Sequence, residues 1–207
     1  MKKILFILIT IFCVFIIYYV NLDKKIFILS IGDNLTLGID DSNYQKDINN
    51  CLGKRLKNNV IFGNDGDYRI IDLLNDINNN KKFIYKNKEY LLDNVLIKAD
   101  IIFISIGMND LNYNNNNNYD YLDEVIRDLD TLLKLIRKYS KEDIYIFNYY
   151  NLNSNELTIY INKRLNNLVK KYDINILDIS NINSIELNKD DYDIIEKKMI
   201  ESLKEFY

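Results

Sequence analysis

The sequence predicts one doubly wound α/β domain of the flavodoxin-like type, in which a five-stranded parallel sheet lies between two layers of helices. Five short apolar runs, rich in Ile and Phe, alternate along the chain with longer segments of helical periodicity. The runs are continuous rather than alternating, which is typical of parallel strands covered on both faces. With 207 residues, of which 48% are hydrophobic, the chain can bury one substantial core.

The same periodicity places the individual elements. Strands are expected at residues 26–31, 60–62, 101–106, 144–149 and 174–179, and helices at 44–57, 68–77, 121–139, 154–172 and 189–206. Residues 81–98 are interpreted as a small hairpin and a short helix inserted before the third strand, and the Asn run 114–118 as a surface loop. The helix at 121–139 has one clear buried face, formed by Leu122, Val125, Ile126, Leu129, Leu132, Leu133 and Ile136.

An apolar run precedes the predicted domain. Residues 4–20 contain no charge and follow Lys2 and Lys3. As a helix, this run would span roughly 25 Å, near the lower limit for crossing a bilayer. Tyr18 and Tyr19 stand where an aromatic interface belt would fall. We therefore predict a single-pass signal anchor in residues 1–24 and an extracytoplasmic domain in 25–207; a cleaved signal, which would release a secreted domain, and a buried core helix are the alternatives.

Composition excludes several classes of function. The net charge of −3 gives no electrostatic basis for binding nucleic acid. The chain has no His, so no imidazole can act as a general base or as a zinc ligand, and we expect neither a cofactor nor a metal. Cys51 is the only Cys beyond the predicted anchor, which excludes a disulfide within the domain, and we interpret it as a half-buried helix residue.

Three short polar motifs follow the first three predicted strands. They are IGDN at residues 31–34, GNDGD at 63–67 and IGMND at 106–110, and a fourth segment, SIELNKDDYDII at 184–195, leads into the last helix. Doubly wound sheets bind ligands beyond the carboxyl ends of their strands, where these motifs lie. Together they resemble the SGNH, or GDSL, hydrolase family, from about residue 26 to the end of the chain.

The resemblance implies an ester hydrolase of the lipase, esterase or deacetylase type. In the first block, Asn34 stands where the family has its nucleophilic Ser. An oxyanion hole would be formed by the backbone N–H groups of Asn34 and Gly66 and by the side-chain amide of Asn109. The remaining matches to the motifs of the family are Gly32, Asp33, Gly38, Gly107 and Asp110.

The fourth block of the family carries the catalytic Asp and His. With Tyr192 aligned on the Tyr of that block, Glu186 occupies the His position and Ser184 the Asp position, with Asn183 as the other candidate for the acid. An Asn amide is neither nucleophilic nor readily deprotonated, and ester cleavage by this route needs a nucleophile, a base and an orienting acid. The sequence therefore predicts a non-catalytic or impaired protein that binds an acyl, acetyl or glycan ligand of the cell envelope, or that serves as an envelope scaffold.

An active esterase or deacetylase with an unorthodox site is the alternative. Glu186 would activate water there, or Asp33, Asn109, Asp110 and Glu186 would hold a hard cation on oxygen ligands.

Several other polar residues have simpler structural interpretations. Asp110 is expected as a loop or cap residue, Thr36 as packed in its turn, and Asp178 as an end-of-strand hydrogen-bonding residue rather than the triad acid. Asp190 and Asp191 begin the last helix, where acidic side chains interact favourably with the helix dipole.

Overall fold

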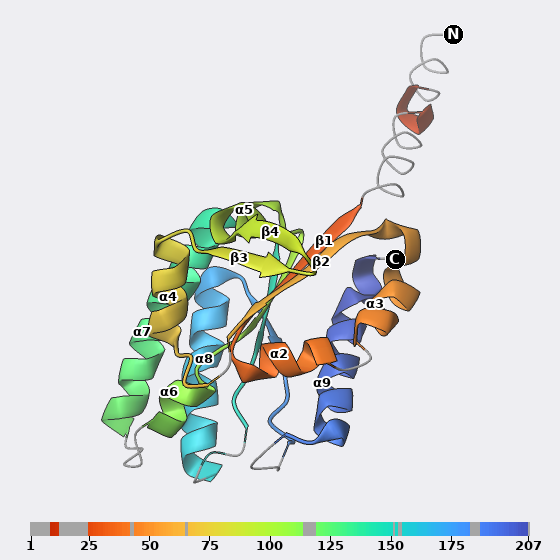
Figure 1. The fold of residues 1–207 in the computed structure, drawn as a ribbon. Coiled ribbons are helices and arrows are strands. Elements are labelled where there is room, and N and C mark those ends of the chain that lie inside the picture. Colours follow the sequence, from red (N-terminus) through yellow and green to blue (C-terminus); the bar gives the residue numbers. More distant parts are fainter. Residues whose placement is uncertain are drawn as a thin grey trace.

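The computed structural model describes residues 9–12, 25–41, 44–64, 66–113, 119–150, 152, 155–182 and 187–206. Its centre is a parallel sheet with strand order β2-β1-β5-β6-β7 and helices on both faces (Figure 1). The predicted flavodoxin-like α/β fold with five parallel strands is thus confirmed. The strands are β1 (Ile26–Gly32), β2 (Leu56–Gly63), β5 (Ile101–Ser105), β6 (Asp143–Phe147) and β7 (Asn175–Leu177).

The sheet divides the apolar core into two clusters. Successive side chains of a strand point to opposite faces, so Phe27 and Leu29 of β1 belong to one cluster and Ile26 and Ile28 to the other. On the first face lie α4 (Ile70–Asn78), α5 (Leu92–Lys98), α7 (Tyr119–Tyr139) and α8 (Asn155–Tyr172). On the second lie α2 (Asn34–Asp41), α3 (Tyr44–Leu52) and α9 (Lys189–Ser202), while α6 (Met108–Tyr113) follows the end of β5.

Two short helices occur where no element was expected from the sequence. Residues 34–41 and 108–113 form α2 and α6, which are too short for a clear hydrophobic period. The start of α2 is stabilised by Asp33, whose side-chain Oδ1 accepts the N–H of Leu35 and whose carbonyl accepts the N–H of Leu37. Conversely, the helix expected to reach residue 57 ends at Leu52, because a 3-10 turn at Gly53–Arg55 leads directly into β2.

The predicted hairpin and short helix are present. Strands β3 (Lys82–Tyr85) and β4 (Lys88–Leu91) pair antiparallel around a turn at Lys86 and Asn87, both with positive φ, and α5 follows. Because α4 returns from the carboxyl end of the sheet, this unit lies at the amino end, where β1 begins (Figure 1). The candidate motifs lie at the opposite end of the strands.

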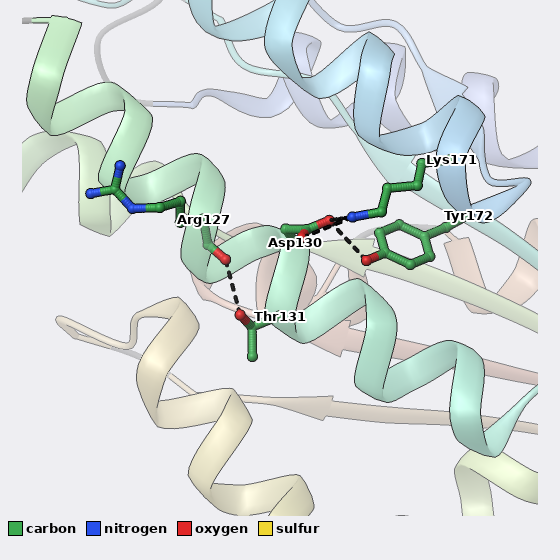
Figure 2. A network of polar contacts seen from close by, with 5 residues as sticks. All are labelled: Arg127, Asp130, Thr131, Lys171 and Tyr172. Atoms are coloured by element: carbon green, nitrogen blue, oxygen red, sulfur yellow. Dashed lines mark hydrogen bonds and ion pairs between the residues drawn. The ribbon is translucent and has the colours of Figure 1, made fainter.

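Polar contacts supplement the apolar packing of α7 on α8. Figure 2 shows Lys171 and Tyr172 of α8 donating to Asp130 of α7, with Nζ–Oδ1 and Oη–Oδ1 distances of 2.7 and 2.8 Å. Within α7, Oγ1 of Thr131 donates to the carbonyl of Arg127 at 3.0 Å. Exposed ion pairs of this kind contribute about 0–1 kcal/mol, so the buried face of α7 holds the helices together.

The predicted anchor falls mostly outside the described residues. Within 1–24 the structure describes only residues 9–12, which are helical and exposed. In the part of the chain that is described, no helix combines the length and apolarity needed to cross a membrane. The anchor and the division of the chain at residue 24 therefore stay predictions.

Candidate functional site

The first motif is fixed to the end of β5 by a close backbone approach. Gly32 has φ +144°, and a Cβ at this position would lie 1.6 Å from the carbonyl oxygen of Ser105, so only Gly fits. The next residue, Asp33, donates its N–H to the same carbonyl at 2.9 Å. This pair of contacts brings the turn after β1 against the end of β5.

Asp33 is a buried carboxyl group at this junction. Its side chain is 3% exposed, and Oδ1 accepts the Oγ–H of Ser105 at 2.8 Å and the N–H of Leu35 at 3.2 Å. Among the described residues, Oδ2 is buried without a hydrogen-bond partner. Burial raises the pKa of Asp33 to about 7, against the opposing effect of the two hydrogen bonds. Near neutral pH the carboxyl therefore exists in both protonation states.

Asn34 begins α2 directly after Asp33. Its side chain is exposed, and the backbone N–H groups of the first helical turn have no intrahelical acceptor. The predicted nucleophile position is thus at the start of a helix, where it presents an amide. Thr36, two residues farther along α2, is buried, and its Oγ1 lies close to Gly32.

Asn109 connects the second and third motifs. Its Nδ2 donates to the carbonyl of Gly66 at 3.0 Å and to that of Tyr68 at 2.8 Å. Gly66 is exposed with φ +70°, a conformation that favours Gly. Because both amide hydrogens are donated to backbone carbonyls, neither is left for a ligand in this arrangement. The part of Asn109 in an oxyanion hole stays a prediction.

Asp110 stabilises the start of α4, in line with its interpretation as a cap residue. Its Oδ2 accepts the backbone N–H of Ile70 at 3.0 Å, so the third motif also holds the helix that follows the second motif. Burial raises the pKa of Asp110 to about 6, although the hydrogen bond from Ile70 and the charge of Arg69 favour the ionised form.

A cleft of about 270 Å³ opens at this end of the sheet. The described residues that line it offer one carboxyl group, amides, phenols and a small apolar surface, and none of them is a Lys or an Arg. They come from the turn into α2, from α6, from the segment after β6 and from the start of α9. The lining residues are Asp33, Asn34, Leu35, Met108, Asn109, Asn112, Tyr150, Leu187 and Tyr192.

Tyr150 and Asn112 line the cleft although no sequence motif indicated them, and Tyr192 entered only as the residue on which the fourth block was aligned. Tyr150 lies three residues after the end of β6, so the rule that ligands bind beyond the strand ends would have found it. Tyr192 reaches the cleft because it packs on Gly38: a Cβ there would lie 2.2 Å from the Tyr192 hydroxyl oxygen. In the same way, a Cβ at Gly107 would lie 2.6 Å from the hydroxyl oxygen of Tyr149.

The predicted replacements of the catalytic base and acid cannot be placed. Glu186 and Ser184, like Asn183, lie outside the described residues. The chain is described again from Leu187, and Asn188 caps α9, where its Oδ1 accepts the N–H of Asp190 at 2.8 Å. Residue 191 completes this cap, since Oδ2 of Asp191 accepts the N–H of Asn188 at 3.0 Å.

Asp178 follows the end of β7 and makes hydrogen bonds there. Its Oδ1 accepts from Oγ of Ser180 and from Nδ2 of Asn148, each at 2.7 Å, and these bonds hold its pKa below the usual range. This matches its interpretation as an end-of-strand residue.

Cys51 is half-buried in α3 and unpaired. Across the described residues, no three His, Cys, Asp or Glu side chains gather as a metal site.

Comparisons with known proteins place this geometry among esterase folds. No family model matches the chain, and neither does any curated protein. An acetyl xylan esterase, AlAXEase, superimposes with a TM-score of 0.63 at 13% identity, over 86% of this chain and 100% of its own. A lipolytic protein of the G-D-S-L family from Veillonella parvula DSM 2008 superimposes with a TM-score of 0.57 at 17% identity, over 86% and 97%.

A family 3 carbohydrate esterase from Clostridium thermocellum is similar to the same extent. It has a TM-score of 0.56 at 19% identity and covers 87% of this chain and 100% of its own. Identities this low establish the fold alone. The cleft lies at the carboxyl ends of the strands, and its first motif reads Gly-Asp-Asn instead of Gly-Asp-Ser. The chain thus has an SGNH/GDSL hydrolase-like fold.

Proposed function

We propose that the chain is a membrane-anchored, extracytoplasmic protein that binds an acyl, acetyl or glycan group in this cleft without normal ester hydrolysis. One observation carries the proposal: Asn34, which the Gly-Asp-Asn motif aligns with the nucleophilic Ser of the family, lines the cleft. Its amide cannot attack an ester, and a chain without His has no imidazole to activate a substitute. The architecture of an esterase site is kept while its chemistry is lost.

The chemistry of the cleft supports a small neutral ligand. Amides, phenols and a carboxyl group can exchange hydrogen bonds with hydroxyl and amide groups, and Leu35, Met108 and Leu187 offer apolar contact. The described lining has no cation to neutralise a phosphate or a carboxylate. The cleft volume of about 270 Å³ lies just below the usual range of about 300–1,000 Å³, which suits an acetyl group or one sugar ring rather than a long acyl chain.

The proposed anchor is supported by the sequence. The apolar run at 4–20, the lysines before it and the tyrosines at its end have the order of a signal anchor. In a membrane fraction, the chain should resist extraction by alkaline carbonate, and protease should reach the domain only from the extracytoplasmic side. Release by carbonate would contradict the anchor and leave the cleft proposal intact.

The loss of catalysis is tested with p-nitrophenyl acetate and butyrate. The purified chain should show no turnover in the usual enzyme range of about 1–10³ s⁻¹. Asn34→Ser alone should stay inactive because no base accompanies the new hydroxyl, whereas Asn34→Ser with Ser184→Asp and Glu186→His should gain activity. Robust turnover by the wild-type chain would contradict the proposal; loss of that turnover in Glu186→Gln or with a chelator would identify the unorthodox site.

Ligand binding is tested separately from catalysis. Saturation-transfer NMR with N-acetylglucosamine and with glucose should show transfer to the acetyl or ring protons of at least one of the two sugars. Asn112→Ala, an exposed substitution in the lining of the cleft, should weaken this transfer, and Asn94→Ala, an exposed substitution at the other end of the sheet, should not. Equal transfer in both variants would show that the sugar does not bind in this cleft.

A further inference from the structure

We propose that the amino end of the sheet, formed by the hairpin β3–β4 and α5, is a docking surface for anionic lipid headgroups, and that it turns the candidate cleft away from the bilayer. This inference rests on the proposed anchor and adds an orientation to it. We call this surface, made of residues 82–98 together with the start of β2, the hairpin surface. It is independent of any chemistry in the cleft.

The length of the connecting segment keeps the hairpin surface near the membrane. Five residues, 21–25, separate the end of the apolar run from Ile26, the first residue of β1. Fully extended, five residues span at most about 18 Å. If residues 4–20 cross the bilayer, the amino end of β1 cannot move farther than this from the membrane surface.

The hairpin surface lies at the same end of the sheet as the start of β1. Phe27, near the start of β1, lines one hollow of about 420 Å³ together with Lys57, Tyr90 and Val95. In Figure 1 the hairpin and α5 lie beside the point where β1 begins, and α2 and α6, which line the cleft, lie toward the opposite end. Any membrane that the short connection holds near β1 therefore faces the end of the sheet on which the hairpin surface lies.

Large apolar side chains are exposed on this surface. Ile84 is 75% exposed, because it points to the outer face of β3 while Phe83 and Tyr85 point inward, and Leu91 lies on the same outer face of the hairpin. On α5, Ile97 is 58% exposed. Single exposed apolar residues are common on protein surfaces, but these three gather at one end of the molecule.

Lysines accompany these apolar side chains. Residues 82–98 contain four Lys against one Glu and one Asp, although the whole chain carries a net charge of −3. Glu89 is already paired with Lys82 at 2.6 Å. The exposed lysines of the hairpin surface are Lys57, Lys82, Lys86, Lys88 and Lys98.

Charge and apolarity together favour anionic lipid over other partners. Each Lys close to an anionic bilayer contributes about 1 kcal/mol of attraction, and exposed Ile side chains can enter the boundary between headgroups and acyl chains. The anchor makes this attraction intramolecular, so weak individual contacts suffice to orient the domain. The cleft at the other end of the strands then faces the envelope and its ligands.

The test uses the full chain in vesicles and two matched labelling sites. Ile84→Cys and Ile159→Cys, each with Cys13→Ser and Cys51→Ser, carry the same fluorescent label. Ile159 is the control site: it is 68% exposed and lies near the start of α8, at the opposite end of the sheet. Vesicles contain phosphatidylcholine alone or with one third phosphatidylglycerol, and a headgroup spin label quenches nearby fluorophores. We expect at least about fivefold stronger quenching at position 84 than at 159 in the anionic vesicles.

Each outcome has a distinct meaning. If the triple variant Lys82→Glu, Lys86→Glu, Lys88→Glu loses the difference in quenching between positions 84 and 159, the result supports the proposal. Equal quenching at both sites, in a chain that carbonate does not extract, overturns the hairpin surface but leaves the anchor standing. Equally strong quenching at position 84 in neutral vesicles overturns the role of anionic lipid. A chain that carbonate releases overturns the anchor, and the hairpin surface with it.

Discussion

The hydroxyl of Ser105, at the end of β5, donates a hydrogen bond of 2.8 Å to Oδ1 of Asp33, directly after β1. Oδ2 of the same carboxyl group is buried without a partner among the described residues. Oδ1 is therefore stabilised as a hydrogen-bond acceptor, whereas Oδ2 is removed from water without a replacing hydrogen bond, which costs free energy. The free energy of unfolding should accordingly depend on the protonation of Asp33.

We expect stability to fall as the pH rises from about 4 to about 7. The pKa of Asp33 is about 7 in the folded state against 3.8 for the free side chain, so the folded state binds more protons throughout this range. Stability from a raised pKa is fully present below the unfolded pKa and is lost as the pH passes the folded one. Asp110, with a folded pKa of about 6, adds a smaller effect of the same sign.

Asp33→Asn isolates the contribution of this residue. Asn keeps an oxygen acceptor for Ser105 and Leu35 but cannot ionise, so urea unfolding should show a flatter pH profile and a gain at pH 8 of the order of 1–3 kcal/mol. At pH 4.5 the variant should be no more stable than the wild type. An unchanged slope between the two pH values would show that Asp33 titrates normally.

Asn109→Ala should loosen the second motif. It removes both donors to the carbonyls of Gly66 and Tyr68, and we expect a loss of about 1–2 kcal/mol in the free energy of unfolding, with faster amide exchange at residues 66–68. Asn112→Ala is the matched control, because Asn112 is an exposed Asn in the same helix. If the two variants lose the same stability, the contacts of Asn109 do not hold this segment.

Gly38→Ala should be destabilising although Gly lies inside helix α2. Ala normally favours a helix over Gly by about 1 kcal/mol, but its Cβ would lie 2.2 Å from the hydroxyl oxygen of Tyr192. Overpacking of this kind costs about 1–3 kcal/mol, so thermal unfolding should show a net loss. In the background of Tyr192→Ala the same substitution should become stabilising; a loss that persists there would rule out the clash.

The sequence was a good guide wherever local pattern determines structure. The continuous apolar run of β1 and the one-sided pattern of α7 are properties of neighbouring residues, so strands and long helices could be placed within a few residues. The short helix α2 was missed because its start depends on contacts of Asp33 rather than on periodicity. The strand order of the sheet could not be read from any local segment.

By itself, the sequence determined that the chain lacks His and carries Asn34 in place of the Ser of a GDSL motif, because residue identity needs no coordinates. Only the tertiary structure decided which polar groups meet: Ser105 with Asp33, 72 residues apart, and Asn109 with Gly66, 43 residues apart. Such pairs form because parallel strands bring distant strand ends to one edge of the sheet. The proposed loss of esterase chemistry thus rests on composition, whereas the cleft is a property of the fold.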